Sequence, residues 1–370
     1  MSGPRTESGP ARIGKAPRRR IYFAAIIRAV NKKRVYVIYT GGTIGMQRTP
    51  DGYAPAPGSL QEQLRGMPEL RDPAMPDVVI HEYDPLLDSS NMTPVEWMKI
   101  ARDIAANYAD YDGFVVLHGT DTMAYTASAL PFILEGLAKP VVVTGSQIPL
   151  VELRSDGRDN LVSSLLAAAT LDIPEVCLYF GRQLLRGNRA VKVSTHGLTP
   201  FVSPNFPPLA TFGVDIEVRW DLVRKRGAEL RVHDVETAIL SVVRLIPGIS
   251  ATFLRNALAA PVQAVVLQAY GVGNGPDRDV AFLDALAEAT ARGVVVVDCS
   301  QCLTGHVDLD EYTAGSALAK AGAISGYDLT VEAAIAKLTF LFSRGYDVSR
   351  VKEEMQRDLR GEMTVTHPPS

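Results

Sequence analysis

The sequence predicts an α/β protein with a larger, doubly wound N-terminal domain and a smaller C-terminal α/β domain. Short runs of β-branched and other apolar residues alternate with helix-like segments over most of the chain, which is typical of a parallel sheet covered by helices. The alternation stops in the proline-rich stretch 182–215 and resumes after residue 234. The 370 residues, 46% of them hydrophobic, also exceed what one domain usually contains, so we expect two cores.

The first predicted strand is the apolar run Val35–Tyr39, which stops at Gly41 and Gly42. Two glycines allow a tight turn with positive φ and leave the backbone accessible. Thr43 is therefore expected beside a crevice, because ligands of open α/β sheets bind outside the carboxyl ends of the strands. A plain turn and a phosphate loop are the alternatives. This stretch contains neither G-x-x-x-x-G-K-[ST] nor G-x-G-x-x-G, but alone it does not decide the role of Thr43.

The segment after Thr43 has the composition of a surface flap. Prolines and glycines crowd residues 47–59 around Tyr53, and we expect this loop to be mobile and free of regular pairing. Farther along the chain, Thr93, Pro94 and Glu96 form the pattern of a helix start with a capping box. A helix is therefore predicted from this point to about residue 108.

The remaining elements continue the alternation in both domains. In the N-terminal domain we predict strand 114–117, helix 128–137, strand 141–144, helix 160–171 and strand 176–180. In the C-terminal domain we predict strand 238–243, helix 248–258, strand 264–269, helix 280–291, strand 294–297 and helices 314–321, 331–343 and 349–359. The chain then divides into a disordered N-terminal extension (1–29), an N-terminal domain (30–203), a linker (204–234) and a C-terminal domain (235–370).

Charge and cysteine content exclude several classes of protein. Residues 1–34 carry ten Lys and Arg and one acid, whereas the rest of the chain carries 28 basic and 40 acidic residues, so its body is unsuited to binding nucleic acid. No apolar run reaches the ~18 residues that span a bilayer. Three cysteines fit a reducing cytosol without a disulfide framework. We interpret Cys299 and Cys302 as two buried thiols at a strand end rather than as a zinc site.

Two segments together resemble the L-asparaginases of the bacterial cytoplasmic (type I) branch: YTGGTIGM at Tyr39–Met46 and HGTDTMAYTASAL at His118–Leu130. Further matching segments follow in the same order, namely HEYDPLLDSSNMTP (His81–Pro94), VTGSQIPLVELRSDG (Val143–Gly157), RGNRAVK (Arg186–Lys192) and YGVGN (Tyr270–Asn274). The resemblance runs from about residue 30 to about residue 361. It implies the asparaginase-like two-domain fold, hydrolysis of L-asparagine to L-aspartate and ammonia, no cofactor and no metal.

The resemblance assigns catalytic roles to five residues. Thr43 is the nucleophile, Tyr53 lies beside it on the flap, and Thr120, Asp121 and Lys192 form a second group at adjoining strand ends. A hydroxyl needs activation to attack an amide, and a partly desolvated lysine beside a carboxylate can exchange a proton with it. The expected course is a double displacement through an acyl ester of Thr43. The sequence does not decide which threonine attacks first or whether Tyr53 is the immediate base.

The resemblance also implies which residues hold the substrate. Ser89 and its backbone bind the α-carboxylate, while Asp121 binds the α-ammonium group and Asn274 completes that contact. Taken singly, Asp88–Ser90 is equally a polar turn and Asp121 a helix N-cap. The matching segment Arg154–Asp156 is interpreted as structural support. The expected substrate-binding residues are Asp88, Ser89, Ser90, Thr120, Asp121 and Asn274.

Assembly and alternative functions follow from the same comparison. The resemblance implies a cytoplasmic homodimer or dimer of dimers (a homotetramer) in which Asn274 acts across the subunit interface. Some type I members bind asparagine at a regulatory site, but Val191 and Gln268 depart from the hydroxyl and cationic residues expected there, so asparagine-driven cooperativity is not carried over to this chain. One alternative, an amidotransferase subunit acting on misacylated tRNA, needs an added nucleic-acid-binding domain. Another, a non-catalytic amino-acid sensor, does not need the catalytic set that this chain retains.

Overall fold

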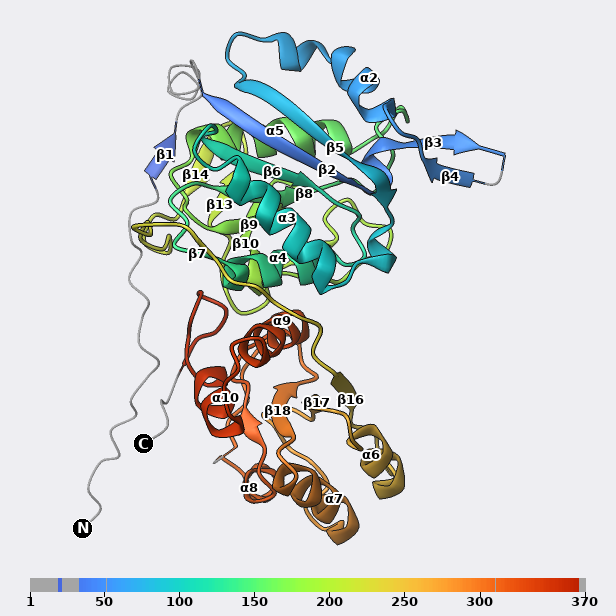
Figure 1. Ribbon diagram of the computed structural model, residues 1–370, viewed down its shortest axis with the longest axis vertical. Coiled ribbons are helices and arrows are strands. Elements are labelled where there is room, and N and C mark those ends of the chain that lie inside the picture. Colours follow the sequence, from blue (N-terminus) through green and yellow to red (C-terminus); the bar gives the residue numbers. More distant parts are fainter. Residues whose placement is uncertain (1–18, 22–32, 51, 310, 366–370) are drawn as a thin grey trace, which may run out of the picture.

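Two separate sheets organise the described part of the chain, one nine-stranded and one four-stranded (Figure 1). The structure is a computed structural model that describes residues 19–21, 33–50, 52–309 and 311–365. The predicted division into a larger N-terminal and a smaller C-terminal α/β domain is confirmed at the level of fold class. None of the helices in these residues has the length and apolar character that a membrane span requires.

The larger sheet has the order β1-β14-β13-β10-β9-β8-β6-β2-β5 within the described residues. Its parallel strands are β2 (Arg34–Gly41), β5 (Asp77–Leu87), β6 (Gly113–Leu117), β8 (Val141–Thr144) and β9 (Val176–Phe180). The chain passes from β2 outward to β5 and returns to β6 on the other side of β2. The strand order therefore reverses between β2 and β6, and this is the place where open α/β sheets bind their ligands.

Helices cover both faces of this sheet. Alternate residues of β2 point to opposite sides: Tyr36 and Ile38 pack toward α3 (Pro94–Ala106) and α4 (Met123–Ile133), whereas Val35, Val37 and Tyr39 pack toward α2 (Ser59–Arg65) and α5 (Gly157–Thr170). The predicted capping box of α3 is confirmed, because the Thr93 hydroxyl accepts from Val95 N and the Glu96 carboxylate accepts from Thr93 N. Burial on both faces explains why these strands read as continuous apolar runs.

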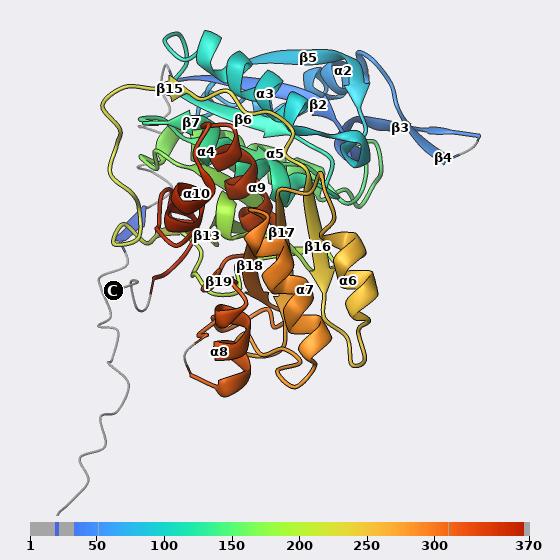
Figure 2. The same cartoon turned by 60° about the horizontal axis from the view of Figure 1, so that its bottom comes forward.

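The smaller sheet consists of four parallel strands in the order β16-β17-β18-β19 within the described residues. Their bounds are β16 (Leu240–Arg244), β17 (Ala264–Ala269), β18 (Val295–Ser300) and β19 (Ile324–Ser325). One face packs on α6 (Ala251–Ala257), α7 (Val280–Ala291) and α8 (Thr313–Lys320), and the other packs on α9 (Val331–Phe342) and α10 (Val348–Met355). α9 also contacts α4, with the rings of Phe132 and Phe340 stacked 5.6 Å apart, and so connects the two domains (Figure 2).

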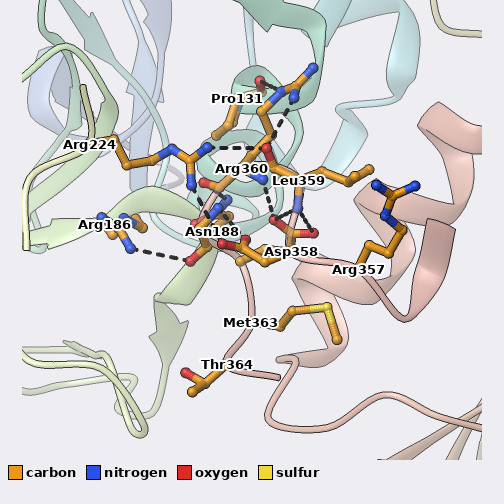
Figure 3. Close-up of polar contacts among 12 residues, drawn as sticks. Pro131, Arg186, Asn188, Arg224, Arg357, Asp358, Leu359, Arg360, Met363 and Thr364 are labelled. Atoms are coloured by element: carbon orange, nitrogen blue, oxygen red, sulfur yellow. Dashed lines mark hydrogen bonds and ion pairs between the residues drawn. The ribbon is translucent and has the colours of Figure 1, made fainter. Parts of the chain in front are cut away.

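Residues 360–364 are held against the N-terminal domain by buried polar contacts (Figure 3). The Arg189 guanidinium donates to Gly361 O at 2.7 Å and pairs with Asp328 at 2.8 Å, and Asn188 donates to Arg360 O at 3.0 Å. Lys337 of α9 and Glu362 form an ion pair of 2.6 Å in which both side chains are fully buried. Removing one partner of such a pair costs about 3–5 kcal/mol, so the ion pair holds the tail to α9, while Arg189 and Asn188 connect the tail to the N-terminal domain.

The structure differs from the sequence prediction in several places. The flap is a paired hairpin, β3 (Met46–Thr49) with β4 (Gly52–Pro55), because its prolines stand at the strand ends rather than within the ladder. The helix expected over 128–137 ends at Ile133, and the next residues form β7 (Leu134–Glu135), which pairs with β15 (Arg231–Val232). Cys299 is buried as expected, but Cys302 is exposed, so the two do not form a buried pair of thiols.

The stretch expected to be a linker, 204–234, contributes two strands to the larger sheet. These are β13 (Ala210–Phe212) and β14 (Ile216–Val218), which extend the sheet beyond β10 (Gln183–Arg186). Within the expected extension 1–29, residues Arg19–Ile21 form β1 on β14, and the other residues lie outside those that the structure describes. The remaining short elements are η1 (Thr43–Gly45), η2 (Pro68–Arg71), η3 (Ser89–Asn91), η4 (Gly187–Arg189), β11 (Val191–Lys192) and β12 (Phe201–Val202).

Candidate active site

The candidate site lies where the parallel strands β2, β6 and β8 end. The Thr40 hydroxyl donates to Leu117 O at 3.0 Å and ties the end of β2 to the end of β6. His118 N donates to Thr144 O at 2.9 Å and ties β6 to β8. The turns after these three strands carry Thr43, Thr120 and Gln147, so three polar side chains follow three adjacent strand ends at the switch point of the sheet.

Two glycines allow the turns to approach each other closely. Gly42 has a φ of 91°, and a Cβ on it would lie 2.5 Å from the Cα of Gly119. A Cβ on Gly119 would lie 2.4 Å from the Oγ of Ser89. Distances this short exclude any larger residue without a shift of the backbone. The glycines before Thr43 and Thr120 therefore bring the turn of Thr43, the turn of Thr120 and the buried Ser89 into direct contact.

Lys192 joins Thr120 and Asp121 in one chain of contacts. Its Nζ donates to Thr120 Oγ1 at 2.8 Å and to Asp121 Oδ1 at 2.7 Å. The Lys192 side chain is only 18% exposed, whereas that of Asp121 is 69% exposed. The lysine is thus held inside the turn cluster, and the carboxylate is free to meet a ligand from solvent. The predicted association of Thr120, Asp121 and Lys192 is present in the structure.

Gln147 is a member of this cluster that the sequence reasoning missed. Thr120 Oγ1 donates to Gln147 Oε1 at 3.2 Å, and Gln147 Nε2 donates to the carbonyls of Thr195 (3.2 Å) and Gly197 (3.1 Å). Its backbone N donates to the Asp156 carboxylate at 3.0 Å. Asp156 therefore has the supporting position that was expected for Arg154–Asp156. The signal for Gln147 was its place three residues after strand 141–144, just as Thr120 comes three residues after strand 114–117.

The predicted carboxylate-binding segment follows β5. Ser89 is buried, and its carbonyl accepts a hydrogen bond from the Thr122 hydroxyl at 2.7 Å. The Asp88 carboxylate accepts from Ser90 N at 3.0 Å and begins η3, which is the polar-turn alternative for this residue. Asp121, in contrast, is not the cap of the next helix, because the N-cap position of α4 belongs to Thr122.

Two of the predicted site residues are not hydrogen-bonded to this cluster. Tyr53 is 42% exposed on the projecting β3–β4 hairpin, where its hydroxyl donates to Glu152 Oε1 at 2.7 Å and accepts from Arg48 at 3.2 Å (Figure 1). Asn274 lies in the C-terminal domain, in the turn after β17. No hydrogen bond between described residues connects either side chain to Thr43, Thr120 or Lys192.

His118 is a buried neutral group beneath the site, and burial lowers its pKa to about 4. Its Nδ1 lies 2.6 Å from Gly119 O and its Nε2 lies 2.8 Å from the Thr126 hydroxyl. Since a carbonyl can only accept, Nδ1 carries the proton and Nε2 accepts. The histidine holds the Gly119–Thr120 turn in place and is not a base for the reaction. Among the residues that the structure describes, no group of three His, Cys, Asp or Glu side chains is placed to bind a metal.

The chain is similar to known asparaginases in sequence and in structure. The family models "Asparaginase, N-terminal" and "Glutaminase/Asparaginase C-terminal domain" match residues 34–224 and 240–355. L-asparaginase 1 of Escherichia coli (strain K12) is 54% identical over 336 residues, which cover 90% of this chain and 99% of that protein. The crystal structure of L-asparaginase I from Vibrio cholerae is 50% identical with a TM-score of 0.84, covering 90% of this chain and 99% of its own.

A more distant relative represents the alternative function. A glutamyl-tRNA(Gln) amidotransferase subunit of Methanobrevibacter smithii is 32% identical over 346 residues, which cover 90% of this chain and 77% of that protein. The resemblance inferred from the sequence is confirmed by the family models and by the identity to the asparaginases. The chain belongs to the asparaginase family.

Proposed function

We infer that the protein is an L-asparagine amidohydrolase, an enzyme that hydrolyses L-asparagine to L-aspartate and ammonia. The observation that carries this function is the position of Lys192 Nζ, which lies 2.8 Å from Thr120 and 2.7 Å from Asp121. The turn that carries these two residues packs directly against the turn of Thr43. The relatives in Escherichia coli and Vibrio cholerae are named for this activity, and their similarity to this chain extends over both domains.

The proposed reaction is a double displacement. The Thr43 hydroxyl, which hydrogen-bonds to none of the described residues, attacks the side-chain amide carbon of asparagine and transfers its proton. The C–N bond then breaks, the nitrogen leaves as ammonia with that proton, and an aspartyl ester of Thr43 remains. Water attacks the ester, releases aspartate and returns a proton to Thr43. Thr120 and Lys192 relay protons in both halves, and backbone N–H groups of the Thr43 and Thr120 turns stabilise the oxyanion.

The substrate is held by its two α-groups. Asp121 presents a largely exposed carboxylate that can pair with the α-ammonium group by a charge-assisted hydrogen bond. Ser89 and the flanking Asp88 and Ser90 form the turn for the α-carboxylate, which Thr122 holds in place through the Ser89 carbonyl. Tyr53 reaches the substrate only when the hairpin swings inward and its contacts with Glu152 and Arg48 break.

The second domain completes the site from a neighbouring subunit. At β16, part of the sheet is not covered by α9. Val242 on this strand is 46% exposed, and Ile246, just beyond the strand, is 57% exposed. A second copy of the chain can bury this apolar surface. Such an assembly is a homodimer or a dimer of dimers with Asn274 at the neighbour's Thr43. The free, partly buried cysteines fit a cytoplasmic location.

The amidotransferase and sensor functions have weaker support. The match covers only 77% of the amidotransferase relative, so that protein has further chain outside the shared region. A sensor only has to bind its ligand. It would not need a lysine such as Lys192 bonded to Thr120, next to the turn of Thr43.

The deciding experiment measures ammonia release on addition of L-asparagine. We expect turnover by the wild-type chain and by a Thr211→Ala control on β13, which lies far from the candidate site in the strand order and where the residue is exposed. Thr43→Ala should release no ammonia above background. Wild-type protein that binds L-asparagine without releasing ammonia would instead support the sensor function.

A further inference from the structure

The turn that carries Asn274 is closed by its own backbone. Tyr270 N donates to Asn274 O at 2.9 Å, and Asn274 N donates back to Tyr270 O at 2.7 Å. Gly273 N also donates to Tyr270 O, at 3.0 Å. These bonds fix the shape of the turn, but they do not fix the Asn274 side chain or the position of the turn relative to the sheet below it.

A fully buried carboxyl group lies directly behind this turn. Asp298 is at the end of β18 and is 0% exposed. Gly273 has a φ of 107°, and a Cβ on it would lie 3.3 Å from Asp298 Oδ2 and 2.7 Å from a methyl group of Val307. The carboxyl is therefore packed against the backbone of the residue before Asn274, with apolar side chains around it.

Several buried polar atoms in this region have no hydrogen-bond partner among the described residues. They are both carboxyl oxygens of Asp298, Oδ1 of Asn274 and the hydroxyl of Tyr270. Native interiors leave few such atoms, and each one indicates a partner that is added by protonation, binding or assembly. A protonated carboxyl supplies one O–H donor, which is what the acceptor oxygen of Asn274 lacks.

The charges around Asp298 favour its neutral form. Burial alone raises its pKa to about 8, with no opposing contribution from a cation among the described residues. The neighbouring titratable groups are Tyr270 on the turn, Cys299 on the same strand and Asp308 on the segment that packs against the turn. None of these supplies a positive charge, so an ionised Asp298 would stand uncompensated in an apolar setting.

We propose that Asp298 is a positioning residue that supports the turn Tyr270–Asn274 from behind and sets where Asn274 presents its amide to the active site. The inference rests on the proposed function of Asn274 in holding the α-ammonium group of the substrate. When Asp298 ionises, the turn loses its buried support and Asn274 moves, so substrate binding weakens. The effect belongs in KM rather than in kcat, because Asn274 holds the substrate and does not take part in bond breaking.

The test is the pH dependence of KM and kcat for L-asparagine from about pH 6 to about pH 10. Asp298→Asn keeps the shape of the side chain and cannot ionise. Asp277→Asn, an exposed residue just beyond the same turn, is the matched control. We expect the ratio of the wild-type KM to the Asp298→Asn KM to be constant below about pH 7 and to rise up to tenfold per unit above about pH 8. Asp277→Asn should follow the wild type.

Asn274→Ala separates this inference from the proposed function, because it removes the amide and leaves Asp298 in the chain. We expect this variant to have a raised KM that no longer depends on whether residue 298 is Asp or Asn. One result would overturn the role of Asp298 and leave the proposed function standing. In that result the ratio of the wild-type KM to the Asp298→Asn KM stays constant across the whole pH range, while Asn274→Ala still has a raised KM. Wild-type KM and kcat in Asn274→Ala would overturn both.

Discussion

The cluster around Thr120 and the turn around Asn274 both follow the ends of parallel strands, yet they treat their polar atoms in opposite ways. In the first region Lys192, Thr120, Asp121 and Gln147 form a continuous chain of hydrogen bonds. In the second, Asn274 Oδ1 and the Asp298 carboxyl oxygens find no partner among the described residues. The first region is hydrogen-bonded within one chain, and for the second we expect protonation, substrate or a neighbouring chain to supply the missing partners.

The largest expected effect on kcat comes from removing the hydroxyl of either threonine, Thr43 or Thr120. Thr43→Ala and Thr120→Ala should each lower kcat at least about a thousandfold, because neither an ester nor a proton relay can form without the hydroxyl. Circular dichroism and the melting temperature should stay close to those of the wild type. Either variant retaining near-wild-type turnover would show that its threonine has been given the wrong role.

Removing the charged partner of that cluster should cost less. Lys192→Met deletes both donors to Thr120 and Asp121, and we expect kcat to fall by about a hundredfold or more, the usual contribution of a general acid–base group. Lys320→Met, at an exposed lysine of α8, serves as the control and should be unaffected. Equal turnover in the two variants would remove Lys192 from the mechanism.

A smaller effect is expected at Gln147, which touches the cluster only through Thr120. Gln147→Leu removes the acceptor of the Thr120 hydroxyl and should lower kcat/KM by about tenfold, the equivalent of one lost hydrogen bond of about 1.4 kcal/mol. Unchanged steady-state kinetics would mean that Thr120 needs no such orientation.

The smallest expected effect concerns Tyr53, whose hydroxyl is bonded to Glu152 and Arg48 rather than to the Thr120 cluster. Glu152→Ala removes the acceptor that holds the tyrosine on the outer hairpin, so closure should become easier and kcat/KM should rise two- to threefold, about 0.5 kcal/mol, since exposed contacts of this kind are weak. Glu311→Ala is a suitable surface control. A fall in kcat/KM would indicate that Glu152 assists Tyr53 rather than restraining it.

The sequence predicted best those parts of the fold that are buried on both sides. Strands 35–39 and 114–117 and the first four residues of strand 264–269 are uninterrupted apolar runs because helices cover both faces, and runs this short favour a strand over a helix. β5 was missed because its exposed positions alternate with partly buried ones at the sheet edge, and β13 and β14 because three residues are too few to show a period.

The candidate site divides in the same way. Thr43 and Thr120 follow predicted strands directly, so their positions could be inferred from local sequence, and Gln147 could have been found by the same rule. Lys192 came from family resemblance alone, because its contact with Thr120 spans 72 residues. The bond between Tyr53 and Glu152 spans 99 residues and has no local signal at all, which is why the outward position of the tyrosine was not anticipated.

The most direct test of a site shared between chains is complementation between a variant that lacks the Thr43 hydroxyl and a variant with weakened substrate binding, at an L-asparagine concentration well below the raised KM of Asn274→Ala. Thr43→Ala and Asn274→Ala chains are dissociated, mixed and reassembled, and ammonia release is compared with that of each parent. If Asn274 serves the neighbour's Thr43, each mixed dimer contains one intact site, and equal mixing should restore up to about a quarter of the wild-type sites. Activity no greater than that of the two parents, with exchange of chains demonstrated by mass spectrometry, would contradict the shared site.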